Sequence, residues 1–275
     1  MNLSIVILTW NSAKYIERCI ASIISCLADT VRQCEIFVVD NGSTDHTVAV
    51  LDGMAINDPF TMNLIQLSEN HGTTVSRNMA LRIAQGDYVC VMDSDVEVRG
   101  TVFTDLMTLL QNDVSIGLAV PKIYYPSGKW QKSHDCFPTV LHKIKRLLFL
   151  RSMEASEGSE ELQSNSVKDV DYAISAFWLF RRSLLDKVGL LDEKIFYAPE
   201  DVDFCLRIWK AGLRIVYQPS VSIIHHTQEI SRGWKLNSAK INHLKGLVYF
   251  FIKHHFLFTP PEFSGTNDKK YQEVQ

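Results

Sequence analysis

The sequence lacks an uninterrupted apolar run long enough to cross a lipid bilayer. The longest such run near the C-terminus spans Leu247–Ile252, whereas a membrane-spanning helix needs roughly 20 apolar residues. The early apolar run Leu3–Leu8 passes at once into polar residues, unlike a secretory leader with a charged start and a cleavage site. From these absences we expect a cytoplasmic protein without a transmembrane segment.

An excess of positive charge is also missing, as is any Cys-x-x-Cys pair. The 28 Lys plus Arg are opposed by 31 Asp plus Glu, which gives a net charge of −3. Such a balance excludes the broad basic field that attracts nucleic acids. Most of the six cysteines lie within apolar stretches, which is typical of reduced, buried thiols. We therefore expect no nucleic-acid partner and a reducing compartment.

Several well-known catalytic motifs are absent. The sequence has no G-x-x-x-x-G-K-[ST], no G-x-G-x-x-G after its first apolar run, no H-E-x-x-H and no G-x-S-x-G. These absences argue against phosphate binding by a P-loop and against serine hydrolase chemistry. What is present is a chain of 275 residues, 46% hydrophobic and 21% charged, the composition of an ordinary globular protein with one large or two small domains.

Short apolar runs alternate with helical periods over the first 120 residues. The expected strands are Leu3–Leu8, Glu35–Val39, Asn63–Leu67 and Tyr88–Met92. Helical spacing begins at Ile16 and again near Thr73. This β-α-β-α-β-α-β order predicts an α/β fold, a mostly parallel open sheet flanked by helices whose ligands bind at the carboxyl ends of the strands.

The pattern becomes less regular after residue 120. Residues 153–171 are acidic and rich in serine, which predicts a mobile surface loop. The elements expected after it are a buried run at Ala173–Phe180, a helix over Asp201–Ala211, and two strands at Leu213–Tyr217 and Val221–Ile224. We divide the chain into one domain, residues 1–229, with halves 1–120 and 121–229, and a C-terminal segment, residues 230–275.

Polar residues follow three of the expected strands. They are Thr9-Trp10-Asn11, Asp40-Asn41 and Asp93-Ser94-Asp95. The two carboxylates of the last triplet project to the same side, and Mg²⁺ typically binds one or two such groups together with substrate phosphates. The triplet therefore suits a metal-diphosphate site. A solvated turn is the alternative, because D-x-D is a common pattern.

A second acidic cluster, Glu200-Asp201-Val202-Asp203, opens a predicted helix. Acids at a helix N-terminus often do no more than stabilise the helix dipole. Combined with a separate metal-type triplet, however, a carboxylate here suits the role of general base. Asp203 lies four residues before Arg207, a spacing typical of an ion pair within the helix.

Two further kinds of residue have alternative interpretations. Strand alternation places one of His225 and His226 inward, either as a hydrogen-bonded core residue or as a metal ligand. Arg77 follows Asn70-His71-Gly72 in the first half of a helix. Its guanidinium either reaches a diphosphate or is a solvated helical charge.

The C-terminal segment is basic and apolar. It has no acidic residue between Ile230 and Pro261. Its basic residues there are Arg232, Lys235, Lys240, Lys245 and Lys253. The segment is either a basic amphipathic helix on an anionic membrane or a terminal helix packed on the domain with a solvated basic face. A second basic apolar stretch, Leu141–Arg151, favours the membrane interpretation.

Taken in order, these pieces resemble the inverting family 2 glycosyltransferases of the GT-A fold, and within them the rhamnosyltransferase-like enzymes of bacterial surface polysaccharides. The segments that carry the resemblance are Ser4–Asn11, Val39–Asp45, Asn70-x-Gly72 with Arg77-Asn78, Gly86–Tyr88, Asp93–Asp95, Leu191–Glu193, Glu200–Asp203 with Arg207 and Gly212, and His225. One departure is Ser175-Ala176, where many relatives have Gly-Ala.

The resemblance implies a role for each candidate site residue. The implied nucleotide pocket is Thr9, Asn11, Asp40 and Asn41, with Arg77 and Asp93 along the donor. Asp95, with Asp93 and His225, would hold Mg²⁺ or Mn²⁺ on the diphosphate. Asp201, beside Glu200, would be the catalytic base. Residues 1–120 would be the nucleotide-sugar half and residues 121–229 the acceptor half.

The implied reaction is an inverting, metal-dependent transfer of a sugar, rhamnose or another hexose, from a nucleotide-diphospho-sugar. The acceptor would be a hydroxyl of a glycan or lipid-linked glycan in cell-surface polysaccharide synthesis, reached at the inner face of the membrane. One alternative is a sugar-nucleotide pyrophosphorylase, although residues 9–14 lack its glycine-rich basic loop. A second is an inactive glycan-binding protein on the same fold.

Overall fold

A computed structural model describes residues 2–28, 30–31, 33–139, 166–227, 238–256, 261 and 263. Most of the loop predicted over residues 153–171 lies outside these ranges, although Lys168–Asp169 form a short strand. The basic stretch 141–151 and the basic residues Arg232 and Lys235 also lie outside them.

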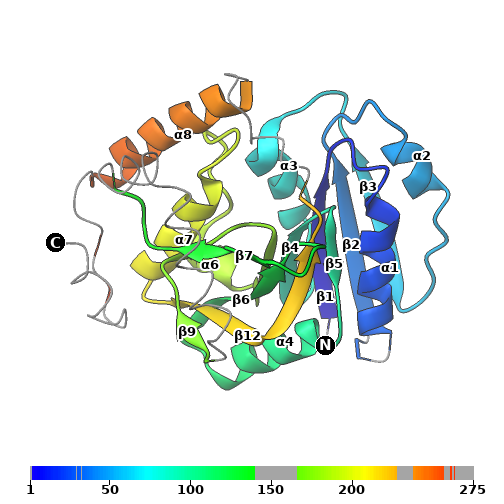
Figure 1. Ribbon diagram of the computed structural model, residues 1–275, viewed down its shortest axis with the longest axis horizontal. Helices are drawn as coiled ribbons and strands as arrows, with labels where there is room; N and C mark the ends of the chain where they lie inside the picture. Colours follow the sequence, from blue (N-terminus) through cyan, green and yellow to red (C-terminus); the bar gives the residue numbers. More distant parts are fainter. Residues whose placement is uncertain are drawn as a thin grey trace.

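In the part of the chain that the structure describes, a ten-stranded sheet forms the centre of the fold (Figure 1). Its main path runs β3-β2-β1-β4-β11-β6-β12-β5, with β7 pairing with β6 and β9 with β12, while β8 and β10 form a separate pair. The strands are β1 (Asn2–Thr9), β2 (Gln33–Asp40), β3 (Phe60–Gln66), β4 (Tyr88–Asp93), β5 (Val96–Val98), β6 (Ile116–Tyr124), β7 (Trp130–Gln131), β8 (His134–Asp135), β9 (Lys168–Asp169), β10 (Tyr172–Ala173), β11 (Phe177–Arg181) and β12 (Arg214–His225). The first four strands are parallel, as expected for an α/β fold.

Helices cover both faces of this sheet and bury two apolar cores. The helices are α1 (Ile16–Leu27), α2 (Thr47–Asp52), α3 (Gly72–Leu81), α4 (Val102–Asn112), α6 (Leu184–Val188), α7 (Glu200–Lys210) and α8 (Ser238–His254). One core lies under α1, α2 and α4, and the other under α3, α6, α7 and α8. The strands between them are apolar on both sides, as buried parallel strands are.

Strand β11 interrupts the parallel arrangement, because it is antiparallel to both of its neighbours, β4 and β6. Its start therefore lies at the carboxyl end of β4, where the backbone N–H of Asp93 donates to the carbonyl of Ala176 over 3.2 Å. This pairing places Ser175 beside the acidic triplet, although some 80 residues separate them in the sequence.

The two strands predicted at Leu213–Tyr217 and Val221–Ile224 are one strand, β12, and that prediction was wrong. The pairing of β12 with β6 shifts register between Gln218 and Ser222, on either side of Pro219. Proline cannot donate to a sheet ladder, so an irregularity is the usual way to accommodate it in a strand. Beyond the irregularity β12 pairs with β5 and ends at His225.

Helix α8 packs on the domain by one side only. Phe250 and Phe251 join the core beside α7. On the other side Leu244, Val248 and Ile252, four residues apart, are 63%, 52% and 65% exposed. Among the described residues, no helix combines the length and the apolar character needed to cross a membrane.

Candidate active site

The acidic triplet and His225 meet at the carboxyl edge of the sheet. Asp93 ends β4, and a two-residue turn leads to β5. Strand β5 pairs antiparallel with the end of β12, with Val96 opposite His225. The backbone N–H of His226 also donates to the carbonyl of Asp95 over 2.9 Å. Sheet pairing therefore fixes His225 against the triplet.

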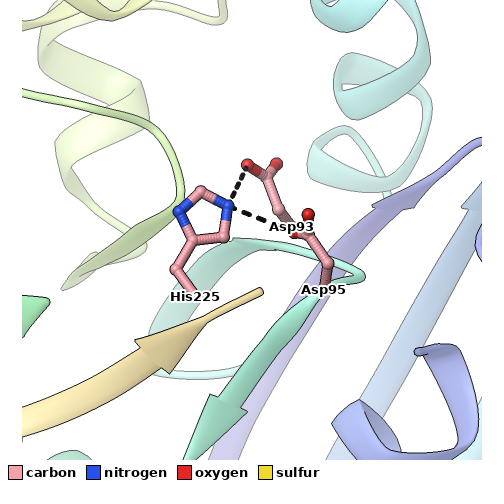
Figure 2. Close-up of side chains that lie close together, drawn as sticks. All are labelled: Asp93, Asp95 and His225. Carbon is pink, nitrogen blue, oxygen red and sulfur yellow. Dashed lines mark ion pairs between the residues drawn. The ribbon is translucent and has the colours of Figure 1, made fainter. Parts of the chain in front are cut away.

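Three side chains converge at this point (Figure 2). His225 Nε2 lies 3.2 Å from Asp95 Oδ1 and 4.0 Å from Asp93 Oδ2. One ligand atom from each of the three residues lies within 4.8 Å of the others. His226 turns elsewhere, since its Nε2 lies 3.2 Å from Glu97 Oε2. Of the two histidines, His225 is the one that faces the carboxylates.

Burial and neighbouring charges shift the pKa of Asp93 and of His225. Partial burial raises the pKa of Asp93, and the neighbouring charge of Asp95 adds to this, against the opposing effects of Arg77 and His225. Burial lowers the pKa of His225, but its hydrogen bond to Asp95 and the charges of both carboxylates raise it overall. A cation between the three side chains would relieve the repulsion between the two acids.

The donor set fits a divalent cation of the Mg²⁺ and Mn²⁺ type. Carboxylate oxygens suit both ions, whereas an imidazole ligand is more common for transition metals. Two acids and one histidine leave several coordination positions for phosphate oxygens or water.

Arg77 connects the triplet to the start of α7. Its guanidinium is 1% exposed, with Nη2 lying 2.5 Å from Asp93 Oδ1 and Nη1 lying 3.4 Å from Glu200 Oε1. Nη1 also donates to Ser175 Oγ over 2.8 Å. Arg77 is therefore not a solvated helical charge. It fixes Asp93 and Glu200 relative to one another.

Ser175 is a site residue whose role the sequence did not predict. Its hydroxyl lies between Arg77 and Glu200, donating to Glu200 Oε1 over 3.3 Å. The only sequence signal was the departure from Gly-Ala in relatives, because a side chain here adds a hydrogen-bonding group that glycine lacks.

The acidic cluster of α7 divides into three environments. Glu200 is buried and points into the Arg77 cluster. Asp201 is partly exposed, and its Oδ1 accepts the backbone N–H of Val202 over 2.8 Å. Asp203 is fully buried and lies 2.9 Å from Arg207 Nε, the ion pair predicted from their spacing. Asp201 is thus the acid of this cluster that faces solvent.

The residues predicted for the nucleotide lie on the neighbouring loops of the same edge. Thr9 and Asp40 are buried at the ends of β1 and β2. Asn11, with φ of +51°, accepts the N–H of Thr44 over 2.8 Å. Asp40 accepts the N–H of Ser43 over 3.1 Å. The loop after β2 is therefore folded back over the end of β1.

Asn41 is engaged in linking β2 to α3. Its Nδ2 donates to Asn70 Oδ1 and to the carbonyl of Gly72, while its Oδ1 accepts from the His71 N–H and from Ser76 Oγ. These contacts use both donors and both acceptor positions of the amide. The side chain of Asn41 thus holds the end of β2 against the start of α3, and a direct contact of Asn41 with a nucleotide stays a prediction.

Comparison with known proteins identifies the chain. The model of the family described as "Glycosyl transferase family 2" matches residues 4–189, about two thirds of the sequence. The chain belongs to glycosyl transferase family 2. The resemblance noted from the sequence motifs is thereby confirmed, and this glycosyltransferase carries the acidic triplet within the matched region.

Among curated relatives, the glycosyltransferase is similar to an N-acetylglucosaminyl-diphospho-decaprenol L-rhamnosyltransferase from Mycobacterium tuberculosis. The two are 28% identical over 268 residues, which cover 92% of this chain and 85% of the relative. The glycosyltransferase GlyG from Streptococcus pneumoniae is 31% identical over 118 residues, covering 42% of this chain and 38% of that protein.

Solved structures with the same fold include a mannosyltransferase from Pyrobaculum calidifontis in complex with GDP-Man and Mn²⁺. It superposes with a TM-score of 0.63 at 20% identity, covering 94% of this chain and 65% of that one. TarS from S. aureus in complex with UDP-GlcNAc superposes with a TM-score of 0.57 at 20% identity, covering 86% and 62%. This likeness confirms the predicted GT-A fold, and the chain spans somewhat less than two thirds of these structures.

Proposed function

We propose that this family 2 enzyme transfers a sugar from a nucleotide-diphospho-sugar to an acceptor hydroxyl, with a divalent metal and inversion at the anomeric carbon. The convergence of Asp93, Asp95 and His225 at the carboxyl edge of the sheet is the observation that carries this proposal. Open α/β sheets bind their ligands at this edge. The fold neighbour from Pyrobaculum calidifontis was solved with a nucleotide sugar and Mn²⁺, which supports the metal.

The donor-side residues prepare the site for a diphosphate. Asp93, Asp95 and His225 would hold Mn²⁺ or Mg²⁺, which when bound neutralises charge on the departing nucleoside diphosphate as a Lewis acid. Arg77 holds Asp93 in place through a short ion pair, and Ser175 orients Arg77. The ligand geometry is therefore set by protein contacts, so little reorganisation is needed during the reaction.

The acceptor-side step is assigned to Asp201. Glycosyl transfer passes through an oxocarbenium-like state at the anomeric carbon. A carboxylate that accepts the proton of the attacking hydroxyl promotes a single displacement from the opposite face. Asp201 is exposed in part to solvent, where an acceptor hydroxyl can reach its carboxylate, whereas Glu200 and Asp203 are buried. No covalent glycosyl-enzyme is required.

For the substrates we propose a nucleotide-activated rhamnose or other hexose and a glycan or lipid-linked glycan acceptor. The similarity to a rhamnosyltransferase over nearly the whole chain supports this choice. The match to glycosyl transferase family 2 includes the donor-side motifs, which argues against the alternative of a sugar-nucleotide pyrophosphorylase. An inactive glycan-binding protein would have no need for the intact triplet together with Asp201, and donor hydrolysis in the absence of acceptor would distinguish the two.

A panel of nucleoside diphosphate sugars tests this function. We expect turnover of one hexose donor with Mn²⁺, weaker turnover with Mg²⁺, and none after chelation with EDTA. NMR of the product should show the anomeric configuration opposite to that of the donor. A retained configuration, or full activity in EDTA, would contradict the proposed mechanism, and failure to turn over any donor would favour the binding protein.

We also propose that the outer side of α8 lies on the anionic inner face of a membrane, where a lipid-linked acceptor would be found. Leu244, Val248 and Ile252 form an exposed apolar stripe there, with exposed Lys245 beside it. No acidic residue occurs over residues 238–256. Figure 1 shows α8, in orange, along the top of the molecule, the side toward which β1 rises from the N-terminus. Apolar area plus basic charge is what binds such helices to anionic lipid.

Flotation with liposomes tests the α8 surface. We expect the protein to float with vesicles that contain anionic phosphatidylglycerol, less so at high salt, and not with neutral phosphatidylcholine alone. Val248→Glu and Lys245→Glu should each reduce binding several-fold, whereas Val114→Glu, at a valine 80% exposed elsewhere, should not. Binding unaffected by the α8 substitutions would place the contact elsewhere. Lys253 is unsuitable for this test because it is ion-paired within the protein.

A further inference from the structure

A buried carboxylate joins the helix of the proposed catalytic base to the last helix of the described chain. Asp203 of α7 is fully buried. Two side chains of α8 reach it, with Lys253 Nζ at 2.6 Å and His254 Nε2 at 2.8 Å from Asp203 Oδ1. Although burial opposes ionisation, the hydrogen bond from His254 and the charges of Arg207 and Lys253 hold the pKa of Asp203 far below its usual range.

Lys253 also ties α8 to the loop that precedes α7. Its Nζ lies 2.7 Å from Asp192 Oδ2, and the hydroxyl of Tyr249 donates to the same oxygen over 2.9 Å. Further along this loop, Phe196 contacts the start of α3, where its carbonyl accepts the N–H of Thr73 over 2.8 Å. The ammonium group of Lys253 is therefore shared by the carboxylates of Asp192 and Asp203, which lie before and after Asp201 in the sequence.

The second contact is a direct approach of the backbones. A Cβ at Gly246 of α8 would overlap the carbonyl oxygen of Ala198 and lie 3.1 Å from Cδ of Pro199. These are the two residues before Glu200 and Asp201. Ala198 has φ of +38°, a conformation that residues with a Cβ rarely adopt and that persists only when its surroundings impose it. Gly246 is part of those surroundings.

We infer that α8 positions the catalytic base: Lys253 and Gly246 set the place of the first turn of α7, and with it the carboxylate of Asp201. This inference rests on the proposed role of Asp201. The contacts flank Asp201 from both sides, at Ala198-Pro199 and at Asp203. A general base must lie within hydrogen-bond reach of the proton that it accepts. A shift of about 1 Å in such a group lowers the rate by as much as about a hundredfold.

Apart from the 3.4 Å ion pair between Arg77 and Glu200, the donor side of the site is held by other contacts. Asp93, Asp95 and His225 are held by the pairing of β4, β5 and β12, and the loop residues Asn11 and Asp40 by contacts around β1 and β2. A disturbance of α8 should therefore lower kcat and leave the affinity for nucleoside diphosphate unchanged. If these residues only stabilised the fold, their substitution would lower the melting temperature without lowering kcat separately from nucleotide affinity.

The test compares Lys253→Met with Lys253→Arg in the full chain, using a water-soluble acceptor so that membrane binding plays no part. Lys253→Met removes the charge shared by Asp192 and Asp203, and we expect kcat to fall about 10- to 100-fold. The KM for donor and the Kd for nucleoside diphosphate with Mn²⁺ should stay within twofold of the wild type. Lys253→Arg keeps a cation at both carboxylates and should recover most of kcat. Lys187→Met, at an exposed lysine of α6, is the control and should leave kcat unchanged.

Gly246→Ala provides a second, independent variant. Alanine has a higher helix propensity than glycine. The substitution therefore stabilises α8 itself, while its added methyl group clashes with Ala198. We expect a lower kcat with unchanged nucleotide affinity, measured well below the melting temperature of the variant.

Wild-type kcat in both Gly246→Ala and folded Lys253→Met would overturn the inference, as would an equal loss of kcat and nucleotide affinity. These outcomes differ from a failure of the proposed function, in which the wild type itself transfers no sugar or Asp201→Asn retains full activity.

Discussion

Replacing Asp201 with Asn is expected to lower sugar transfer by about a hundredfold or more, the usual contribution of a positioned general base. The amide has nearly the shape of the carboxylate but cannot accept the proton of the acceptor hydroxyl. Asp201 is the partly exposed acid at the start of α7, while Glu200 and Asp203 are held in buried ion pairs. Because a general base acts in the chemical step, the loss should appear in kcat. It is measured by release of nucleoside diphosphate with saturating donor and acceptor.

Nucleotide binding provides the control for this variant. Calorimetry with nucleoside diphosphate and Mn²⁺ should give the wild-type affinity, because the carboxylate of Asp201 is not among the three converging ligands. Near-normal turnover in Asp201→Asn would move the role of base to Glu200 or Asp203. That assignment would in turn require one of the ion pairs with Arg77 or Arg207 to open during the reaction.

The second large effect is expected for Asp95→Ala, which should abolish metal-dependent donor binding. Removal of a residue that merely supports a metal ligand costs about 10- to 100-fold in affinity, so loss of a ligand itself should cost at least about a hundredfold. In this variant Asp93 would be the only carboxylate left to hold the cation beside His225. One oxygen of Asp93, Oδ1, remains paired with Arg77. Calorimetry with nucleoside diphosphate, in Mn²⁺ and in EDTA, measures the metal-dependent part of the affinity.

Glu97→Ala is the matched control, because it removes a carboxylate two residues along the chain. Glu97 pairs with Arg99 and His226 rather than facing the cluster. It should keep the difference between Mn²⁺ and EDTA. If folded Asp95→Ala also kept that difference, the metal would have to bind elsewhere in the site.

The donor half of the fold was predictable because its signals are local. Each parallel strand is a short apolar run, and the polar residues that end β1, β2 and β4 follow directly in the sequence. The connections between strands in such a fold obey general rules, so the order of elements predicts that Asp40 and Asp93 lie at the same edge of the sheet.

The remaining features depend on contacts between distant parts of the chain. The sequence predicted two strands around Pro219, because it does not reveal that β6 pairs with both parts across the irregularity. Arg77 had two interpretations until its burial between Asp93 and Glu200 decided between them. Lys253 was one basic residue among five in its segment, and its role depends on Asp203, 50 positions earlier.

The pairing of β5 with β12 has a consequence for the biogenesis of the enzyme. Asp95 and His225 lie side by side, yet the ribosome adds the histidine 130 codons after the aspartate. Contacts of such long range form only after the entropy of closing the intervening chain has been paid. A nascent chain that already contains Asp93 and Asp95 therefore still lacks His225, the third of the proposed metal ligands. A divalent ion bound by all three side chains would report that β12 has joined the sheet.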